Sequence, residues 1–234
     1  MCGVQSMPSH AQNPPETAPE PGAEQTYFAM FSLPRKLTID TSALERDFYK
    51  LSRRLHPDLY ARKSAEEQAW SLRQSSLLND AYRTLKEPVA RTAYLLKLEG
   101  VRVEDENSEM REHKEKQNRV PADLLEEVFE LNMQLEEMRA NRKMGEDDPA
   151  LRGDLERART QFEKMLAAVD EDLRSAWAGW DAALDANDAA VKNKQKDAML
   201  ALLDRRSYLR NLLREVNGVL SPQMSGVAQA HIHI

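Results

Sequence analysis

The sequence of 234 residues has one cysteine, Cys2, and no apolar run close to the roughly 20 residues that span a bilayer. A single cysteine excludes a disulfide, and any zinc site built from several cysteines, within one chain. The first 26 residues carry three acidic side chains and no lysine or arginine, unlike a secretory or mitochondrial targeting segment. These absences predict a cytoplasmic protein with no membrane segment, no metal and no cofactor.

Glycine is also scarce, with 8 in the whole chain, and runs of β-branched residues are few. Both features argue against a β-sheet protein. Long stretches rich in Ala, Leu, Glu, Lys and Arg favour helices instead. Because 41% of the residues are hydrophobic, the chain can still bury modest cores. The composition therefore predicts an all-α fold.

Composition and charge divide the chain into five segments. We expect a disordered, proline-rich leader at 1–26, a head at 27–100, a charged connection at 101–120, a helical tail domain at 121–220 and a terminal tail at 221–234. The head holds 13 basic and 9 acidic residues, a net of +4, whereas the chain after residue 100 has a net of −7. The two halves should therefore prefer different partners.

An amphipathic helix that runs into a rigid loop is the main feature of the head. Its apolar face repeats at steps of four, three and four in Leu44, Phe48, Leu51 and Leu55. Another face carries the cations Arg46, Lys50, Arg53 and Arg54. Pro57 disfavours the α conformation at His56 and ends the helix, so the side chains of His56 and Asp58 are expected in a loop. A cationic face that ends in such a loop indicates docking on an acidic protein surface.

Capping signals and apolar periods place the other helices. Ser42 with Glu45 and Ser64 with Glu67 predict capping boxes at two helix starts in the head. The expected helices after the loop are 64–86, 89–98, 122–142, 149–184 and 187–217. The seam expected for the last of them is Val191, Ala198, Leu202, Leu209, Leu212 and Val216. Sustained three-four spacing in the last three helices is typical of an antiparallel three-helix bundle.

A second apolar line runs along the first helix of the tail domain. Leu125, Phe129 and Met133 lie about 100° round from the core seam and are edged by Glu130 and Glu137. A helix that is apolar on two faces either lies deep in a core or presents one face to a partner. A three-helix bundle has little depth, so partner binding is the favoured interpretation.

The head resembles a J-domain, the module by which co-chaperones engage chaperone ATPases of the DnaK/HscA type. The resemblance is carried by His56-Pro57-Asp58 and by Ala81-Tyr82-x-x-Leu85. The continuation Pro88-x-x-Arg91-x-x-Tyr94-Leu95-Leu96 is similar to HscB-type co-chaperones of iron–sulfur cluster assembly, as is Phe28-x-x-Phe31-x-Leu33-Pro34. Val120-Pro121-x-x-Leu124-Leu125-x-Glu127-x-Phe129-Glu130-Leu131 resembles the first helix of the HscB C-terminal bundle.

This resemblance implies a J-domain followed by a C-terminal three-helix bundle, with no enzymatic activity of its own. It implies that Asp58 accepts charged hydrogen bonds from an arginine of the ATPase, and that the bundle carries an IscU-like scaffold protein. The implied scaffold contacts are Leu125, Phe129, Glu130, Met133, Glu137 and Tyr208. The chain also departs from the family. Leu59 stands where most J-domains have lysine, no Cys-x-x-Cys pair precedes the head, and Glu126 and Met133 replace an apolar and an acidic residue.

Other interpretations of the same residues remain open. A His–Asp catalytic dyad lacks a nearby nucleophile or metal-ligand set. Nucleic-acid binding is disfavoured because the head is only mildly basic and lacks a second cationic element. A J-domain co-chaperone with a different client, or a helical adaptor with no chaperone role, fits the same helices. We expect a monomer or weak dimer, bundle packing for Trp177 and Trp180, and no metal at His231 and His233.

Overall fold

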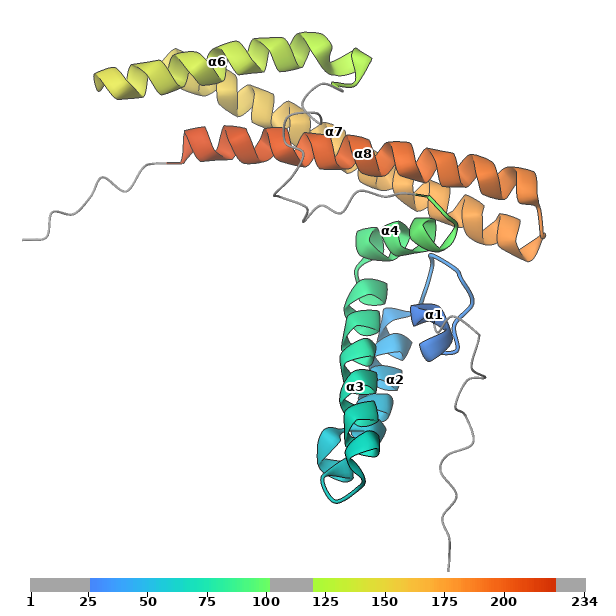
Figure 1. The fold of residues 1–234 in the computed structure, drawn as a ribbon. Helices are drawn as coiled ribbons and strands as arrows, with labels where there is room; N and C mark the ends of the chain where they lie inside the picture. The colour runs from blue at the N-terminus through green and yellow to red at the C-terminus, as the bar shows by residue number, and fades with distance from the viewer. Residues whose placement is uncertain (1–25, 102–119, 222–234) are drawn as a thin grey trace, which may run out of the picture. The chain divides into compact units, whose positions relative to one another are not determined.

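The computed structural model describes residues 26–101 and 120–221 (Figure 1). The expected leader, the interior of the connection and the terminal tail, with Cys2, His231 and His233, lie outside these residues. Over the described residues every regular element is helical, which confirms the all-α prediction. The elements are α1 (Tyr27–Met30), α2 (Thr41–Leu55), η1 (Pro57–Tyr60), α3 (Ala65–Lys86), α4 (Pro88–Leu98), η2 (Ala122–Leu124), α6 (Leu125–Met144), α7 (Pro149–Asp185) and α8 (Ala189–Leu220).

Two compact units account for the described residues. The first comprises 26–34 and 45–82, and the second comprises 35–44, 83–101 and 120–221. The boundary predicted at residue 100 was drawn from composition and charge. Whether the segments on either side of it fold on their own stays a prediction. Each unit is described separately below.

The first unit is a helical hairpin built from α2 and α3. The rings of Phe48, in the middle of α2, and Tyr82, near the end of α3, stack with centroids 4.2 Å apart. At the opposite end, the Ser71 and Ser75 hydroxyls donate to the Leu55 carbonyl at 2.6 and 2.9 Å. These pairings make the two helices antiparallel. The buried apolar side chains of this unit are Phe28, Phe31, Leu78 and Ala81.

Helix starts follow the capping chemistry only in part. The predicted Ser42 capping box is wrong: the Asp40 carboxylate caps α2 by accepting the N–H groups of Ser42 and Ala43 at 2.9 and 3.0 Å. The second box is confirmed, since Ser64 N–H donates to Glu67 Oε2 at 2.9 Å and Glu67 N–H donates to Ser64 Oγ at 3.2 Å. Hydrogen bonds from the Ser64 backbone and side chain lower the pKa of Glu67.

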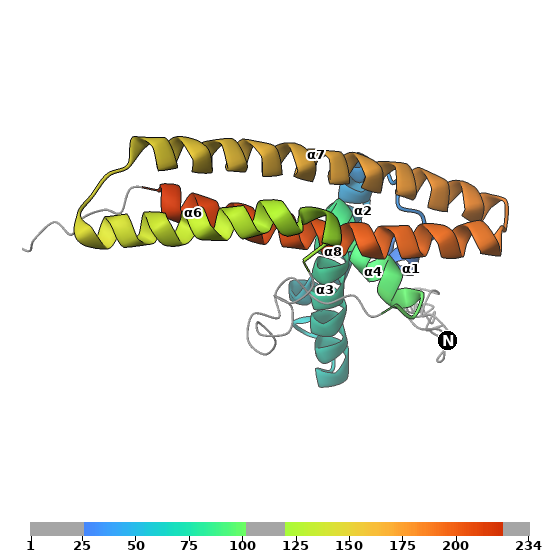
Figure 2. The same ribbon diagram turned by 90° about the horizontal axis from the view of Figure 1, so that it is seen from above.

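The second unit is organised by the long antiparallel hairpin of α7 and α8. Over one half of this hairpin, α6 packs as the third helix (Figure 2). An ion pair of 2.8 Å joins Arg205 to Asp123, and Arg142 donates to the Ser221 carbonyl at 3.3 Å, so α6 runs parallel to α8. The predicted α6 seam is buried throughout: Leu124, Val128, Leu131, Leu135 and Met138. This arrangement confirms the three-helix bundle.

The other half of the α7–α8 hairpin is covered by α4 and by residues 35–40. Helix α4 packs on α8, and Leu37 and Thr38 donate their backbone N–H groups to the Asp181 carboxylate, both at 2.8 Å. The buried Trp180 indole donates to the Arg35 carbonyl at 3.0 Å. The predicted α8 seam is wrong here, because Val191 is exposed and Met199 and Leu203 are buried instead.

Candidate interaction surfaces

The His-Pro-Asp loop is a short 3₁₀ turn that presents its polar side chains to solvent. His56 takes an extended conformation (φ −58°, ψ 130°), as expected before proline, and its Nδ1 accepts the Asp58 N–H at 3.3 Å. The Leu59 N–H donates to the His56 carbonyl at 3.0 Å, which closes the turn. The Asp58 side chain is 89% exposed and its Oδ2 lies 3.4 Å from His56 Nδ1, so the carboxylate is accessible to hydrogen-bond donors of another molecule. The predicted exposed loop is therefore present in the structure.

All four predicted cations of α2 are exposed. Lys50 pairs with Asp47 on the same helix at 2.8 Å. Within the described residues, Arg46, Arg53 and Arg54 have no ion-pair partner. These three guanidinium groups are therefore available to an acidic surface beside the loop.

Three further large side chains of the first unit are exposed, and the sequence alone did not identify them as contacts. Tyr49 is exposed on α2, and its position on the helical wheel falls beside Arg46 and Arg53. Leu59 in η1 is 62% exposed and Trp70 in α3 is 39% exposed. The sequence could have identified Tyr49, because it follows Arg46 by three residues and precedes Arg53 by four, which places it on the cationic face. For Trp70 no such signal exists, because its exposure depends on how η1 packs.

The second apolar stripe of α6 lies on the surface rather than in the core. Phe129 is 69% exposed, and Leu125 and Met133 are more than half exposed. Glu130 and Glu137, on its edges, are exposed as well, and Glu130 accepts a hydrogen bond from Gln134 at 3.2 Å. The core of the bundle is instead formed by the neighbouring seam of α6, about 100° round the helix, whose side chains are buried.

Tyr208 is half-buried on α8. It follows Arg205 by three residues and so lies near the same face of α8 as the ion pair of Arg205 with Asp123 at the start of the α6 region. Burial is the first cause of the raised pKa of its phenol, and the Glu215 charge adds to it. Tyr208 therefore lies one helical turn beyond the α8 residue that pairs with Asp123.

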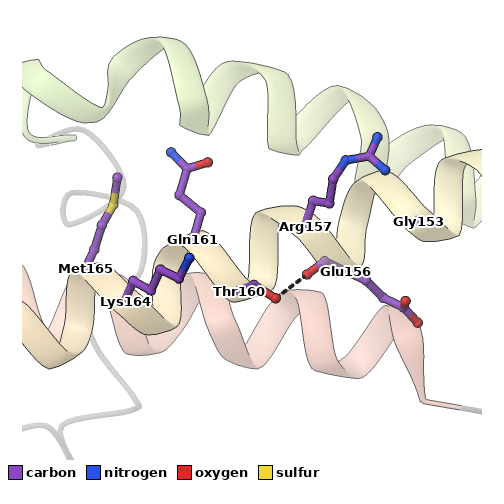
Figure 3. Close-up of a pocket in the computed structure, with 7 residues that line it drawn as sticks. All are labelled: Gly153, Glu156, Arg157, Thr160, Gln161, Lys164 and Met165. Atoms are coloured by element: carbon purple, nitrogen blue, oxygen red, sulfur yellow. Dashed lines mark hydrogen bonds between the residues drawn. The ribbon is translucent and has the colours of Figure 1, made fainter.

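A shallow groove on α7 offers no catalytic arrangement (Figure 3). All the side chains that line it come from this helix: Gly153, Glu156, Arg157, Thr160, Gln161, Lys164 and Met165. The Thr160 hydroxyl donates a hydrogen bond to the Glu156 carbonyl at 3.0 Å. Among the described residues no three His, Cys, Asp or Glu side chains gather as a metal site, and none of the helices is long and apolar enough for a membrane span.

A helical hairpin whose turn exposes His-Pro-Asp beside a cationic helix face, followed by a helical bundle, defines a J-domain protein. No protein-family model matches the chain. Among solved structures, the chaperone HscB from Vibrio cholerae is 26% identical, with a TM-score of 0.52 over 83% of this chain and 97% of that one. The human co-chaperone protein HscB shares the fold at 23% identity, with a TM-score of 0.50 over 84% and 83% of the two chains. These two matches support an HscB-type co-chaperone.

Proposed function

We propose that this co-chaperone docks on a DnaK/HscA-type chaperone ATPase, stimulates ATP hydrolysis there and delivers an IscU-like iron–sulfur scaffold protein. The observation that carries the proposal is the exposed α6 stripe of Leu125, Phe129 and Met133, in a chain whose His-Pro-Asp loop is also exposed. One surface suits an ATPase and the other suits a client. The expected cytoplasmic location, monomeric or weakly dimeric state and lack of catalysis remain predictions.

The chaperone-docking surface comprises His56, Pro57, Asp58, Arg46, Lys50, Arg53 and Arg54. The Asp58 carboxylate is placed to accept charge-assisted hydrogen bonds, each contributing about 1.5–3 kcal/mol. Pro57 restricts the backbone of the loop, which lowers the entropy lost on docking. The cations of α2 steer an acidic partner, so stimulation should weaken as ionic strength rises.

Replacing Asp58 with alanine tests the docking surface. Stimulation of the ATPase of an HscA-type chaperone should fall to the unstimulated rate, because the alanine side chain accepts no hydrogen bond. Asp80→Ala is the matched control, since Asp80 is an exposed aspartate of the same unit at the other end of α3. Far-ultraviolet circular dichroism should be unchanged for both variants. Wild-type stimulation by Asp58→Ala would reject the docking surface.

The scaffold-binding surface comprises Leu125, Phe129, Glu130, Met133, Glu137 and Tyr208. Burying exposed leucine and phenylalanine side chains against a partner contributes about 1.5–3 kcal/mol each. Glu130 and Glu137 on the rim favour a basic border on the scaffold. The half-buried Tyr208 adds an aromatic side chain with a polar tip, a type that is common at interfaces.

The double variant Leu125→Ala/Phe129→Ala tests this surface. We expect its affinity for an IscU-like scaffold to fall by about 100-fold or more, measured by calorimetric titration, because two anchors are removed. Val191→Ala, an exposed apolar residue at the start of α8, serves as the control and should bind normally. Full scaffold affinity in the double variant would show that the stripe serves another client or none.

A further inference from the structure

Three large apolar side chains adjoin the His-Pro-Asp loop in the first unit, and we call Leu59, Tyr60 and Trp70 the apolar rim. Leu59 follows Asp58 directly and is 62% exposed, and Trp70 is 39% exposed. The ring of Tyr60 lies 5.7 Å from that of Trp70 at an interplanar angle of 56°. One exposed leucine is ordinary on a protein surface, but a leucine beside an aromatic pair forms a contiguous patch.

The fold of the unit does not require these side chains to be apolar. None of them belongs to the buried core around Phe28 and Leu78. The backbone of the turn is held by its own hydrogen bonds, from Leu59 N–H to the His56 carbonyl at 3.0 Å and from Lys63 N–H to the Tyr60 carbonyl at 2.9 Å. Leu59 therefore lies on a hydrogen-bonded turn and outside the buried core.

Any protein that binds the Asp58 carboxylate must also cover Leu59. Neighbouring Cα atoms are only about 3.8 Å apart, whereas a specific interface buries about 800 Å² on each partner. A lysine in place of Leu59 would be repelled by an arginine that binds Asp58 and would hold water in the contact. Leucine and tryptophan exclude water instead, which strengthens a neighbouring charged hydrogen bond.

We propose that Leu59 and Trp70 form an apolar contact with the chaperone ATPase beside Asp58. This inference rests on the proposed function and deepens it. The partner surface it requires is acidic where it faces α2 and apolar where it faces the rim. Part of the docking affinity then comes from burying apolar surface, and that part does not weaken as the salt concentration rises.

The test measures ATPase stimulation of an HscA-type chaperone by the full chain at increasing co-chaperone concentration. Leu59→Ala and Trp70→Ala should each raise the half-maximal concentration about tenfold, the factor that corresponds to about 1.4 kcal/mol. Leu72→Ala is the matched control: Leu72 is 58% exposed but lies 200° round α3 from Trp70. It should stay within about twofold of wild type.

Leu59→Lys separates an apolar contact from a cationic one. It should raise the half-maximal co-chaperone concentration at physiological salt and make the remaining stimulation more sensitive to salt than that of wild type.

Stronger stimulation by Leu59→Lys, or wild-type stimulation by Leu59→Ala, would overturn the inference. In both cases Asp58→Ala would still abolish stimulation, so the docking proposal would stand. Unaltered stimulation by Asp58→Ala would instead reject the docking proposal itself. Leu59 is largely exposed, so its variants should fold normally. The test therefore holds even if Trp70→Ala is unstable.

Discussion

Arg91 is a buried cation of α4. In the structure it is 5% exposed and donates to the Leu85 carbonyl at 2.5 Å, close to the end of α3. Burial lowers the pKa of its guanidinium, and the charges of Glu87 and Asp181 oppose that shift. Hydrophobic periodicity does not predict a buried arginine, because its burial depends on hydrogen-bond and charge partners rather than on an apolar repeat.

The confirmed capping box gives the first prediction at this scale. Hydrogen bonds from Ser64 hold the pKa of Glu67 below its ordinary value, so the ionised form is favoured more in the folded than in the unfolded chain. The resulting stability is present above the unfolded pKa of about 4.3 and is lost as pH falls through the lower folded pKa. Glu67→Gln should therefore lower the urea midpoint at pH 7 and should lose this difference in acid.

The control for that prediction is Glu66→Gln. Glu66 is the neighbouring carboxylate in the first turn of α3, and within the described residues it accepts no cap hydrogen bond. It shares the favourable interaction with the helix dipole, so a difference between the two variants isolates the box. Equal, pH-dependent losses in both variants would assign the effect to the dipole alone.

Helices were the most predictable elements, because an apolar stripe of period 3.6 specifies both the helix and its buried face. The expected range 149–184 corresponds to α7 at Pro149–Asp185, and 187–217 corresponds to α8 at Ala189–Leu220. In the first half of α8 the apolar period does not identify the buried face. The pattern places Val191 on the seam, yet this half packs against α4 as well as α7, so a different set of side chains is buried.

Two glycines, one inside α7 and one at the end of α6, give a prediction for the helical elements. Gly153 lies inside α7, and a Cβ added there meets only the Arg157 Nη1 at 3.6 Å, an ordinary contact. Gly153→Ala should stabilise the chain by about 0.5–1 kcal/mol, since alanine loses less entropy in a helix. Gly145 ends α6 with φ of 75°, so Gly145→Ala should destabilise by about 1 kcal/mol. Urea unfolding measures both. Changes of the same sign would contradict the assignment of α7 and of the left-handed cap.

At the scale of the whole molecule, sequence analysis predicted the classes of domain but not how segments combine. The resemblance and the periodic helices led to a J-domain followed by a three-helix bundle, and both are present. The sequence did not predict that residues 35–44 and 83–101, which were assigned to the head, belong to the same compact unit as the bundle helices. The reason is physical. A buried carboxylate that accepts backbone N–H groups from a segment more than 140 residues away leaves no trace in hydrophobic periodicity.

Asp181 allows that long-range assembly to be tested. Its two carboxylate oxygens accept the N–H groups of Leu37 and Thr38, each at 2.8 Å, and its side chain is buried. Asp181→Asn keeps the shape but replaces one acceptor with a donor, so a buried N–H group loses its partner. We expect a loss of about 1–3 kcal/mol in urea unfolding, with faster amide hydrogen exchange at residues 37 and 38.

Asp185→Asn is the matched control on the same helix. Asp185 is exposed and forms an ion pair with Lys36 at 2.7 Å, an interaction that contributes at most about 1 kcal/mol because water and salt screen it. Its replacement should leave the exchange of residues 37 and 38 unchanged. If Asp181→Asn cost no more than Asp185→Asn, the segment before α2 would have to be held by the Trp180 hydrogen bond to the Arg35 carbonyl and by apolar packing of Leu37 alone. The Asp181 carboxylate would then be a consequence of that packing rather than its cause.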